Sequence, residues 1–168
     1  MRLMQTSDAA ELAAAYSRNR AHLAYWDPAR PEEFYTEEWQ VADIARRLVA
    51  HEAGADHLFG LFAGEKIVGR FNLTSIVRGP FQSSSLGYWV DASYTGRGLA
   101  SAAINTIIET ARDDLGLHRI EASTLVDNVA SQGVLRKAGF VQIGMAPKYL
   151  KIAGTWQDHN LYQILLHS

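Results

Sequence analysis

Residues 86–100 read LGYWVDASYTGRGLA, and this stretch decides the fold. A strand-like run leads into a short loop with two glycines, Gly96 and Gly98, and the loop leads directly into an apolar helical pattern. The first backbone N–H groups of a helix have no partner inside the helix, and they carry partial positive charge. Because glycine lets the backbone approach an anion closely, the loop is a candidate phosphate site.

A Gly-x-Gly loop before a helix does not by itself identify a ligand. A dinucleotide fingerprint requires a third glycine where this chain has Ser101, and the Lys-Ser/Thr of a nucleotide-triphosphate loop is also missing. The plain alternative is a strand-to-helix turn whose glycines serve close packing. Residues 86–100 alone leave both interpretations open.

Apolar periodicity on either side of this stretch predicts the other elements. The predicted helices cover about 8–25, 36–50, 99–115 and 127–138. The predicted strands cover 58–63, 66–76, 84–90 and 119–125, with further extended segments around 140–143 and 161–166. Gly64 suits the first central position of a type II′ turn, and Gly116 is placed to end the third helix. This order of elements indicates a mixed α+β domain and not a repeating βαβ array.

Composition limits the possible functions. The 168 residues are enough for one domain with a hydrophobic core, so we expect a single domain over 1–168. A net charge of −2 without a basic block argues against binding to nucleic acid or an anionic membrane. The chain has no cysteine, and its six histidines do not pair at metal spacing, so we expect no metal. Without a long apolar run or a signal-peptide core, a soluble cytoplasmic protein is the expectation.

Several motifs resemble those of the GNAT acetyltransferases. The Gly96-Arg97-Gly98 loop is similar to their pyrophosphate loop, although Ser93 stands where Gln or Arg is usual. Residues 118–144 are similar to the second conserved block of that superfamily. More narrowly, the chain resembles the ribosomal-protein-alanine N-acetyltransferase branch in segments 18–26, 87–90, 128–131 and 149–159. The resemblance covers nearly the whole chain in the right order and spacing.

The resemblance implies a fold and a co-substrate. It implies a central, mostly antiparallel sheet flanked by helices, in which parallel strands 84–90 and 119–125 splay apart around the pantetheine arm of acetyl-coenzyme A (acetyl-CoA). Backbone groups near Trp89 and Val90 would bind the pantetheine amides and polarise the thioester carbonyl. The pyrophosphate would lie against the loop and first turn of the following helix, at Gly96, Arg97, Gly98, Leu99 and Ala100. The Arg97 side chain, as a first-turn helix residue, could equally be solvated.

The resemblance also implies catalytic residues. It places Asn128 on the cofactor arm and Ser131 near the sulfur, where Ser131 would give a proton or hydrogen bond to the leaving thiolate. The alternative is a plain helix start, with Asn128 as the N-cap. Relatives carry a carboxylate where this chain has Lys148, and a charged lysine cannot act as a base at neutral pH. Asp158, His159 or a water chain are the remaining candidates for the base. Because there is no cysteine, we expect direct attack in a ternary complex.

The hypothesis from sequence is transfer of an acetyl group from acetyl-CoA to a primary amine. The preferred acceptor is the N-terminal α-amine of a protein, as in the ribosomal-protein-alanine branch. One alternative acceptor is a small amine, such as an amino acid, a polyamine or an antibiotic. A different class is a non-catalytic acyl-CoA-binding module, and a third is a purely structural domain. A homodimer is allowed by the sequence.

Overall fold

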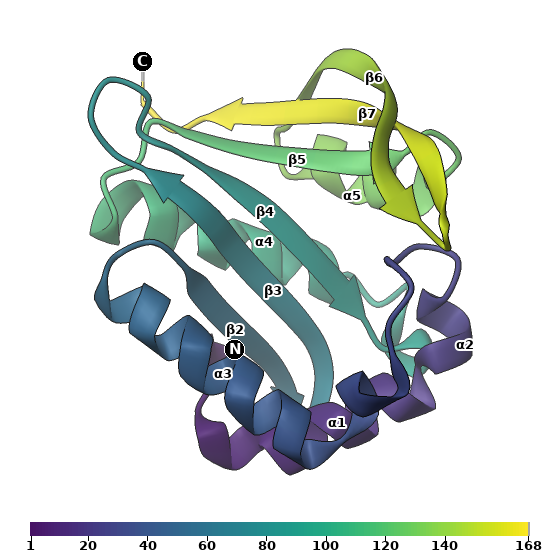
Figure 1. The fold of residues 1–168 in the computed structure, drawn as a ribbon. Coiled ribbons are helices and arrows are strands. Elements are labelled where there is room, and N and C mark those ends of the chain that lie inside the picture. The colour runs from purple at the N-terminus through teal and green to yellow at the C-terminus, as the bar shows by residue number, and fades with distance from the viewer. Residues whose placement is uncertain (168) are drawn as a thin grey trace.

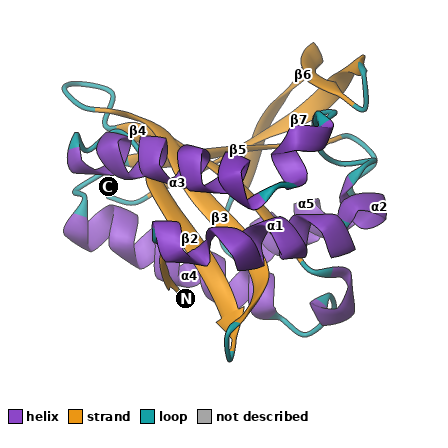
Figure 2. Cartoon of the chain, turned by 60° about the horizontal axis from the view of Figure 1, so that its bottom comes forward, coloured by secondary structure: helices purple, strands orange, loops and turns teal. Residues whose placement is uncertain are grey.

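The computed structural model describes residues 1–167, which form one seven-stranded sheet with helices against both faces (Figures 1 and 2). The helices are α1 Ala9–Arg18, α2 Arg20–Leu23, α3 Glu37–Glu52, α4 Leu99–Glu109 and α5 Val129–Lys137. The strands are β1 Arg2–Leu3, β2 His57–Ala63, β3 Lys66–Val77, β4 Ser83–Val90, β5 Arg119–Leu125, β6 Val141–Ile152 and β7 Thr155–Leu165. The mixed fold expected from the sequence is confirmed.

The sheet has the order β1-β2-β3-β4-β5-β7-β6, and β4 with β5 is its parallel pair. Their pairing covers four positions, from Ser83 opposite Arg119 to Leu86 opposite Ala122. Beyond this point β4 stays paired with β3, and β5 stays paired with β7 as far as Leu125. The two parallel strands therefore part after four residues, as Figure 1 shows, and the expected splayed pair is confirmed.

Alternation along β3 divides the interior into two cores. Phe71 and Leu73 belong to the core between the sheet and α4, which also holds Ile104 and Ile107. Arg70 and Asn72, which alternate with Phe71 and Leu73 in the sequence, line a cavity on the opposite face, toward α1 and α3. Successive residues of a strand point to opposite faces, so one strand serves an apolar core and a polar cavity. A second core under α1 and α3 contains Met4, Leu12, Tyr16, Phe34, Ile44, Ile67 and Trp89.

The helix expected over 8–25 is wrong in one respect, because it is interrupted at Asn19. There α1 ends, and the single turn α2 follows. The buried Asn19 amide donates to the Ala15 carbonyl and to the Asp91 carboxylate, at 2.9 Å each. A side chain that bonds to the backbone and to a distant residue competes with regular helix geometry. The interruption thus depends on a tertiary contact.

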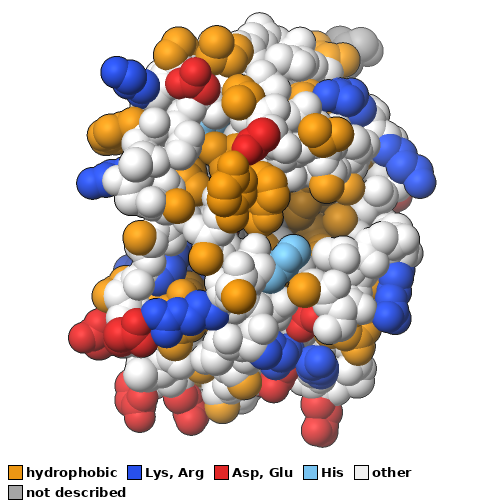
Figure 3. All heavy atoms as spheres, turned by 90° about the vertical axis from the view of Figure 1, so that its right-hand side faces the viewer, with side chains coloured by type: hydrophobic (Ala, Val, Ile, Leu, Met, Phe, Trp, Pro, Cys, Tyr) orange, Lys and Arg blue, Asp and Glu red, His pale blue; other side chains and the backbone are white. Residues whose placement is uncertain are grey.

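The C-terminal strands are longer than expected. Segments predicted around 140–143 and 161–166 belong to a long β6–β7 hairpin with two register shifts, and β6 is an edge strand of the sheet. Exposed hydrophobic side chains gather on the upper half of the face seen in Figure 3, where this hairpin lies. The exposed hydrophobic side chains of β6 and β7 include Val141, Ile143, Met145, Tyr149, Leu150 and Trp156.

Shorter features agree better with the sequence. Thr36 caps α3 by accepting a hydrogen bond from the Trp39 N–H. Gly64 in the β2–β3 turn has φ +62, as the predicted type II′ turn requires, and Gly116 has φ +58 after the helical segment. Among residues 1–167, no helix has the length and apolar character needed to cross a bilayer.

Candidate active site

The glycine loop has a backbone that only glycine adopts readily. Gly96 and Gly98 have φ values of +73 and +76, in the left-handed region. A Cβ on either residue would meet no atom within 4 Å, so the conformation, and not crowding, requires glycine. Gly98 immediately precedes α4, and no side chain caps the helix. The first-turn N–H groups, including those of Leu99 and Ala100, are therefore left for an anion.

Arg97 lies differently from the expectation. It precedes Gly98 and is outside the helix, so its assignment to the first helical turn is wrong. Its guanidinium donates to the Ser93 carbonyl at 2.9 Å and lies over the Tyr94 ring, 5.0 Å from the centroid. Arg97 is exposed and packs against its own loop.

A buried carboxylate fixes the start of this loop. Asp91, at the end of β4, accepts hydrogen bonds from the Ser93 N–H at 2.9 Å, from Arg18 at 3.0 Å and from Asn19 at 2.9 Å. The side-chain Oδ1 of Asn19 in turn accepts a hydrogen bond from the Ala92 N–H at 2.9 Å. Burial alone would raise the pKa of Asp91, but the hydrogen bonds from Asn19, Ser93 and Arg18 outweigh it and lower the pKa to about 2. Residues 18–19 and the start of the glycine loop at 91–93, which are far apart in the sequence, thus form one structural unit.

Trp89 and Val90 lie beyond the last pair formed by β4 and β5. The backbone of Gly87–Val90 on the side of β5 is therefore not engaged by that strand. Trp89 is buried against Tyr16, with ring centroids 5.1 Å apart. Within the described part of the chain, its indole N–H has no hydrogen-bond partner. The structure thus places both residues at the mouth of the slot between the strands.

Ser131 forms a hydrogen bond with Tyr88, a residue that the sequence did not single out as part of the site. Asn128 caps α5, because its side-chain oxygen accepts from the Ser131 N–H at 3.0 Å, as the plain alternative predicted. The Ser131 hydroxyl lies 2.7 Å from the Tyr88 hydroxyl, which joins β4 to α5. Burial raises the pKa of Tyr88 to about 12, although its hydrogen bond with Ser131 opposes the shift. Tyr88 therefore keeps its proton at neutral pH.

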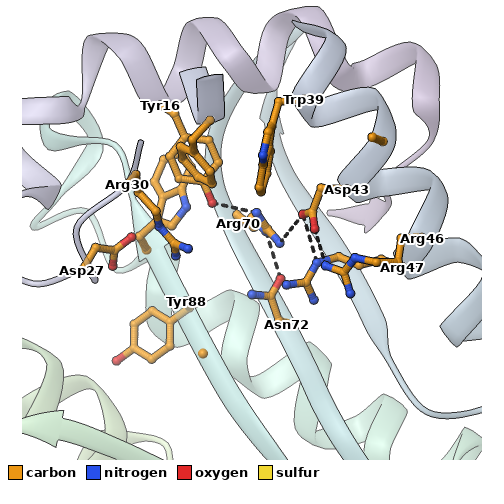
Figure 4. A pocket seen from close by; sticks show the side chains of 14 residues that line it. Tyr16, Asp27, Arg30, Trp39, Asp43, Arg46, Arg47, Arg70, Asn72 and Tyr88 are labelled. Carbon is orange, nitrogen blue, oxygen red and sulfur yellow. Dashed lines mark hydrogen bonds and ion pairs between the residues drawn. The ribbon is translucent and has the colours of Figure 1, made fainter. Parts of the chain in front are cut away.

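A cavity of about 610 Å³ lies on the face of β3 and β4 that α1 and α3 cover. Its walls come from α1, the segment 27–34, α3, β3 and Gly87–Trp89 of β4 (Figure 4). The cavity therefore reaches the strand segment that borders the slot.

Arginines dominate the α3 side of this cavity. Buried Arg70 donates to the Tyr16 hydroxyl at 2.8 Å and to the Asn72 side chain at 3.1 Å. It also forms an ion pair with Asp43 at 3.4 Å, and Asp43 pairs with Arg46 and Arg47 as well. Burial would raise the pKa of Asp43, but the arginines lower it below its usual value. Asp43 is therefore charged at neutral pH and serves as the shared partner of the three arginines.

Lys148, Asp158 and His159, which the sequence brought into question as bases, are not among the residues that line the cavity. Lys148 is exposed, and its backbone N–H donates to the Asp158 carboxylate at 2.8 Å. His159 is buried, and its Nδ1 lies 3.0 Å from the Gln157 carbonyl oxygen. The cavity contains a different carboxylate, that of Asp27, whose pKa is raised by burial against the opposing fields of Arg30 and Arg70. The sequence signal for Asp27 was only a Trp-Asp-Pro helix end.

Histidines and carboxylates do not gather into a metal site in the part of the chain that the structure describes. Within residues 1–167, no three or more such side chains are arranged to hold an ion.

Comparison with known proteins agrees with the fold. The sequence model of the acetyltransferase (GNAT) domain family matches residues 1–141. The [ribosomal protein uS5]-alanine N-acetyltransferase of Escherichia coli is 35% identical over 164 residues, which cover 96% of this chain and 84% of that protein.

Two solved structures are also similar. The ribosomal-protein-S5-alanine acetyltransferase from Vibrio fischeri has a TM-score of 0.96 and 35% identity, and the match covers 99% of this chain and 92% of that one. RimJ of Mycobacterium smegmatis, in complex with a CoA disulfide, has a TM-score of 0.93 and 28% identity, with coverage of 98% and 80%. Family match, sequence identity and fold agree over nearly the whole length: this chain belongs to the GNAT family and is an N-acetyltransferase.

Proposed function

We propose that residues 1–168 act as one cytoplasmic domain that transfers an acetyl group from acetyl-CoA to the N-terminal α-amine of a protein. The observation that carries the proposal is the slot where β4 and β5 part after Leu86 and Ala122. The uncapped glycine loop follows β4, and the cavity lies along its last residues. One edge of β4 thus connects an anion site with an acceptor site.

Acetyl-CoA supplies an activated thioester, and its parts fit the residues present. The free backbone edge at Trp89 and Val90 can pair with the pantetheine amides as an added strand would. The N–H groups from Gly96 to Ala100 suit the pyrophosphate, because they are uncapped and their helix dipole favours negative charge. Asn128 would contact the pantetheine arm through its amide N–H groups, since its carbonyl oxygen caps α5.

The Ser131–Tyr88 pair would stabilise the leaving thiolate. An ordinary thiol has a pKa of about 8.5, so a tyrosine with a pKa of about 12 would give up its proton to a thiolate only at a large cost. The pair therefore acts by donating a hydrogen bond through the Ser131 hydroxyl, which the Tyr88 hydroxyl orients at 2.7 Å. A hydrogen bond to a charged group contributes about 1.5–3 kcal/mol.

The cavity favours a peptide terminus over a polycationic acceptor. Arg30, Arg46, Arg47 and Arg70 line it together with two aspartates, so a polyamine or aminoglycoside would meet like charge. A peptide α-amine has a pKa of about 7.7–8.0, and roughly a tenth to a sixth of it is neutral at pH 7. The relatives act on the terminal alanine of a ribosomal protein, and we propose the same acceptor class here.

The test is thiol release from acetyl-CoA in the presence of peptides that begin with alanine or serine. The same peptides with a blocked N-terminus are the matched control, and only the free termini should give release. Gly98→Glu should abolish release, because it places charge and bulk at the pyrophosphate loop. Thiol release with small amines alone would mean that the acceptor is a small amine and not a protein N-terminus. Thermal stabilisation by acetyl-CoA without release from any acceptor would instead favour a non-catalytic acyl-CoA-binding module.

A further inference from the structure

We propose that Asp27 is the residue that takes the proton from the acceptor nitrogen, which makes the end of the cavity beside β4 an acid–base subsite for a neutral primary amine. The inference rests on the proposed function, because a proton acceptor requires an amine acceptor. It assigns a role to a residue that follows α2 and lies outside the recognised motif blocks of the C-terminal half.

The position of Asp27 is the first argument. Its side chain lines the same cavity as Gly87, Tyr88 and Trp89, the β4 residues that border the slot. In Figure 4, Asp27 and Tyr88 lie on the same side of the cavity, opposite the Asp43 cluster. The Asp27 carbonyl accepts a hydrogen bond from the Ala153 N–H at 3.3 Å, which ties this segment to the β6–β7 turn. A carboxylate is therefore held at the slot end of the cavity.

The two carboxylates of the cavity differ in their partners. Asp43 forms ion pairs with Arg46, Arg47 and Arg70, so its charge is already neutralised. Within residues 1–167, the Asp27 carboxylate forms no ion pair and no hydrogen bond to another side chain or backbone group. Asp27 is thus the cavity carboxylate whose oxygens are left for a ligand.

The surroundings of Asp27 also make it a better base than an ordinary aspartate. Burial raises the pKa of Asp27, which makes its carboxylate a stronger base than an exposed aspartate. The charged groups that face it include Arg30 of its own segment and Arg70 of β3, which both oppose the shift. Arg20 of α2 lines a second cavity together with Asp27. The ionisable tyrosines around it are Tyr16 of α1, Tyr35 before α3 and Tyr88 of β4. The pKa is nevertheless raised on balance.

The proton and electron balance is complete with these groups. The neutral amine forms the new N–C bond with its lone pair, and the C–S bond breaks with its electron pair on sulfur. The attacking nitrogen becomes acidic as it gains positive charge, and Asp27 takes its proton. The thiolate leaves with a hydrogen bond from Ser131, and Asp27 returns its proton to solvent through the open cavity.

Asp27→Asn tests the proposal, because the amide keeps the shape of the side chain and cannot accept the proton. We expect kcat/KM for the acceptor to fall about 100-fold or more, within the usual range for loss of a general base. The KM for acetyl-CoA should stay unchanged. Asp27→Glu should retain part of the activity. Glu33→Gln should retain all of it, since Glu33 is an exposed carboxylate of the same segment that does not line the cavity walls around Asp27.

A pH profile separates proton transfer from a structural role. In the wild type, log kcat/KM should rise with slope 2 below the pKa of Asp27, because two groups must lose protons, and with slope 1 between that pKa and the pKa of the amine. Asp27→Asn should show slope 1 throughout the acidic range. A variant as fast as the wild type, or a slow variant that keeps the two-step profile, would overturn the role of Asp27 alone. Wild-type enzyme silent toward every amine would overturn the proposed function together with it.

Discussion

Asp91→Asn removes one negative charge from the junction between β4 and the glycine loop. The amide oxygen can still accept from the Ser93 N–H, so the loop keeps part of its support. The ion pair with Arg18 at 3.0 Å is lost, and the Asn19 amide loses a charged acceptor at 2.9 Å. The variant therefore isolates the contribution of charge at a buried position.

The magnitude follows from the pKa of Asp91. The pKa of the Asp91 carboxyl is about 2 in the folded protein, against 3.8 for an unperturbed aspartate, so folding favours the charged form. The difference corresponds to about 2 kcal/mol of folding stability at neutral pH. This stability is fully present above pH 4 to 5, falls to about 1 kcal/mol near pH 3 and is lost below the folded pKa. Asp91→Asn should therefore destabilise the protein by about 2 kcal/mol at pH 7 and by about half as much at pH 3.

The measurement is urea unfolding of both proteins at several pH values. The difference between them is informative because other titrating groups cancel in it. Asp113→Asn is the control, since its exposed ion pair with Arg112 should contribute almost nothing at any pH. A gap between wild type and Asp91→Asn that stays constant from pH 7 to pH 3 would refute the linkage to the charge of Asp91. A second consequence is a higher KM for acetyl-CoA, because the same contacts fix Ala92 at the start of the loop.

Three further changes test other parts of the structure. Ser131→Ala should lower kcat about 10- to 100-fold with little change in acetyl-CoA affinity, because a hydrogen bond to the thiolate is lost; equal turnover in steady-state assays would remove Ser131 from catalysis. Gly98→Ala should lower the free energy of unfolding in urea by about 1 kcal/mol, because Gly98 has a φ of +76. Gly133→Ala, in the exposed middle of α5, should raise the free energy of unfolding by about as much. Effects of the same sign would contradict the conformational argument. Burial lowers the pKa of His57 to about 4, and the nearby charges of His51 and Arg78 add to the shift. Protonation of His57 should therefore lower the free energy of unfolding by about 3 kcal/mol between pH 6.5 and 4. A His57→Gln variant whose stability fell equally over this range would disprove the assignment.

Local patterns predicted the elements that depend on local physics. The helix after Gly98 was recognisable because its apolar residues recur with helical spacing and Ala103, Ile104, Ile107 and Ala111 are in fact buried. The splayed strands were different, because no residue pattern in 84–90 or 119–125 encodes where pairing ends. That feature came from family resemblance.

The contacts that organise the candidate site escaped sequence reasoning because they join distant residues. Asn19 and Asp91 are 72 positions apart, and Tyr88 and Ser131 are 43 apart. Asp27 carried no signal beyond a helix end, since a single carboxylate before proline is ordinary in a loop. Its significance depends on the cavity that α1, α3 and β4 enclose around it. Burial and partner geometry are properties of the folded chain.

The short contact between β4 and β5 has a mechanical consequence. Strands β1–β4 form one ribbon and β5, β7 and β6 form another, and four paired positions at one end join them directly. The Tyr88–Ser131 hydrogen bond crosses the gap from β4 to α5, and Tyr25, after α2, donates to Asp127, after β5. Hydrogen exchange in the unliganded protein should therefore reveal a partial opening in which the ribbons separate before either one unfolds. A ligand bonded to both inner edges would act as a missing strand and merge the two transitions into one.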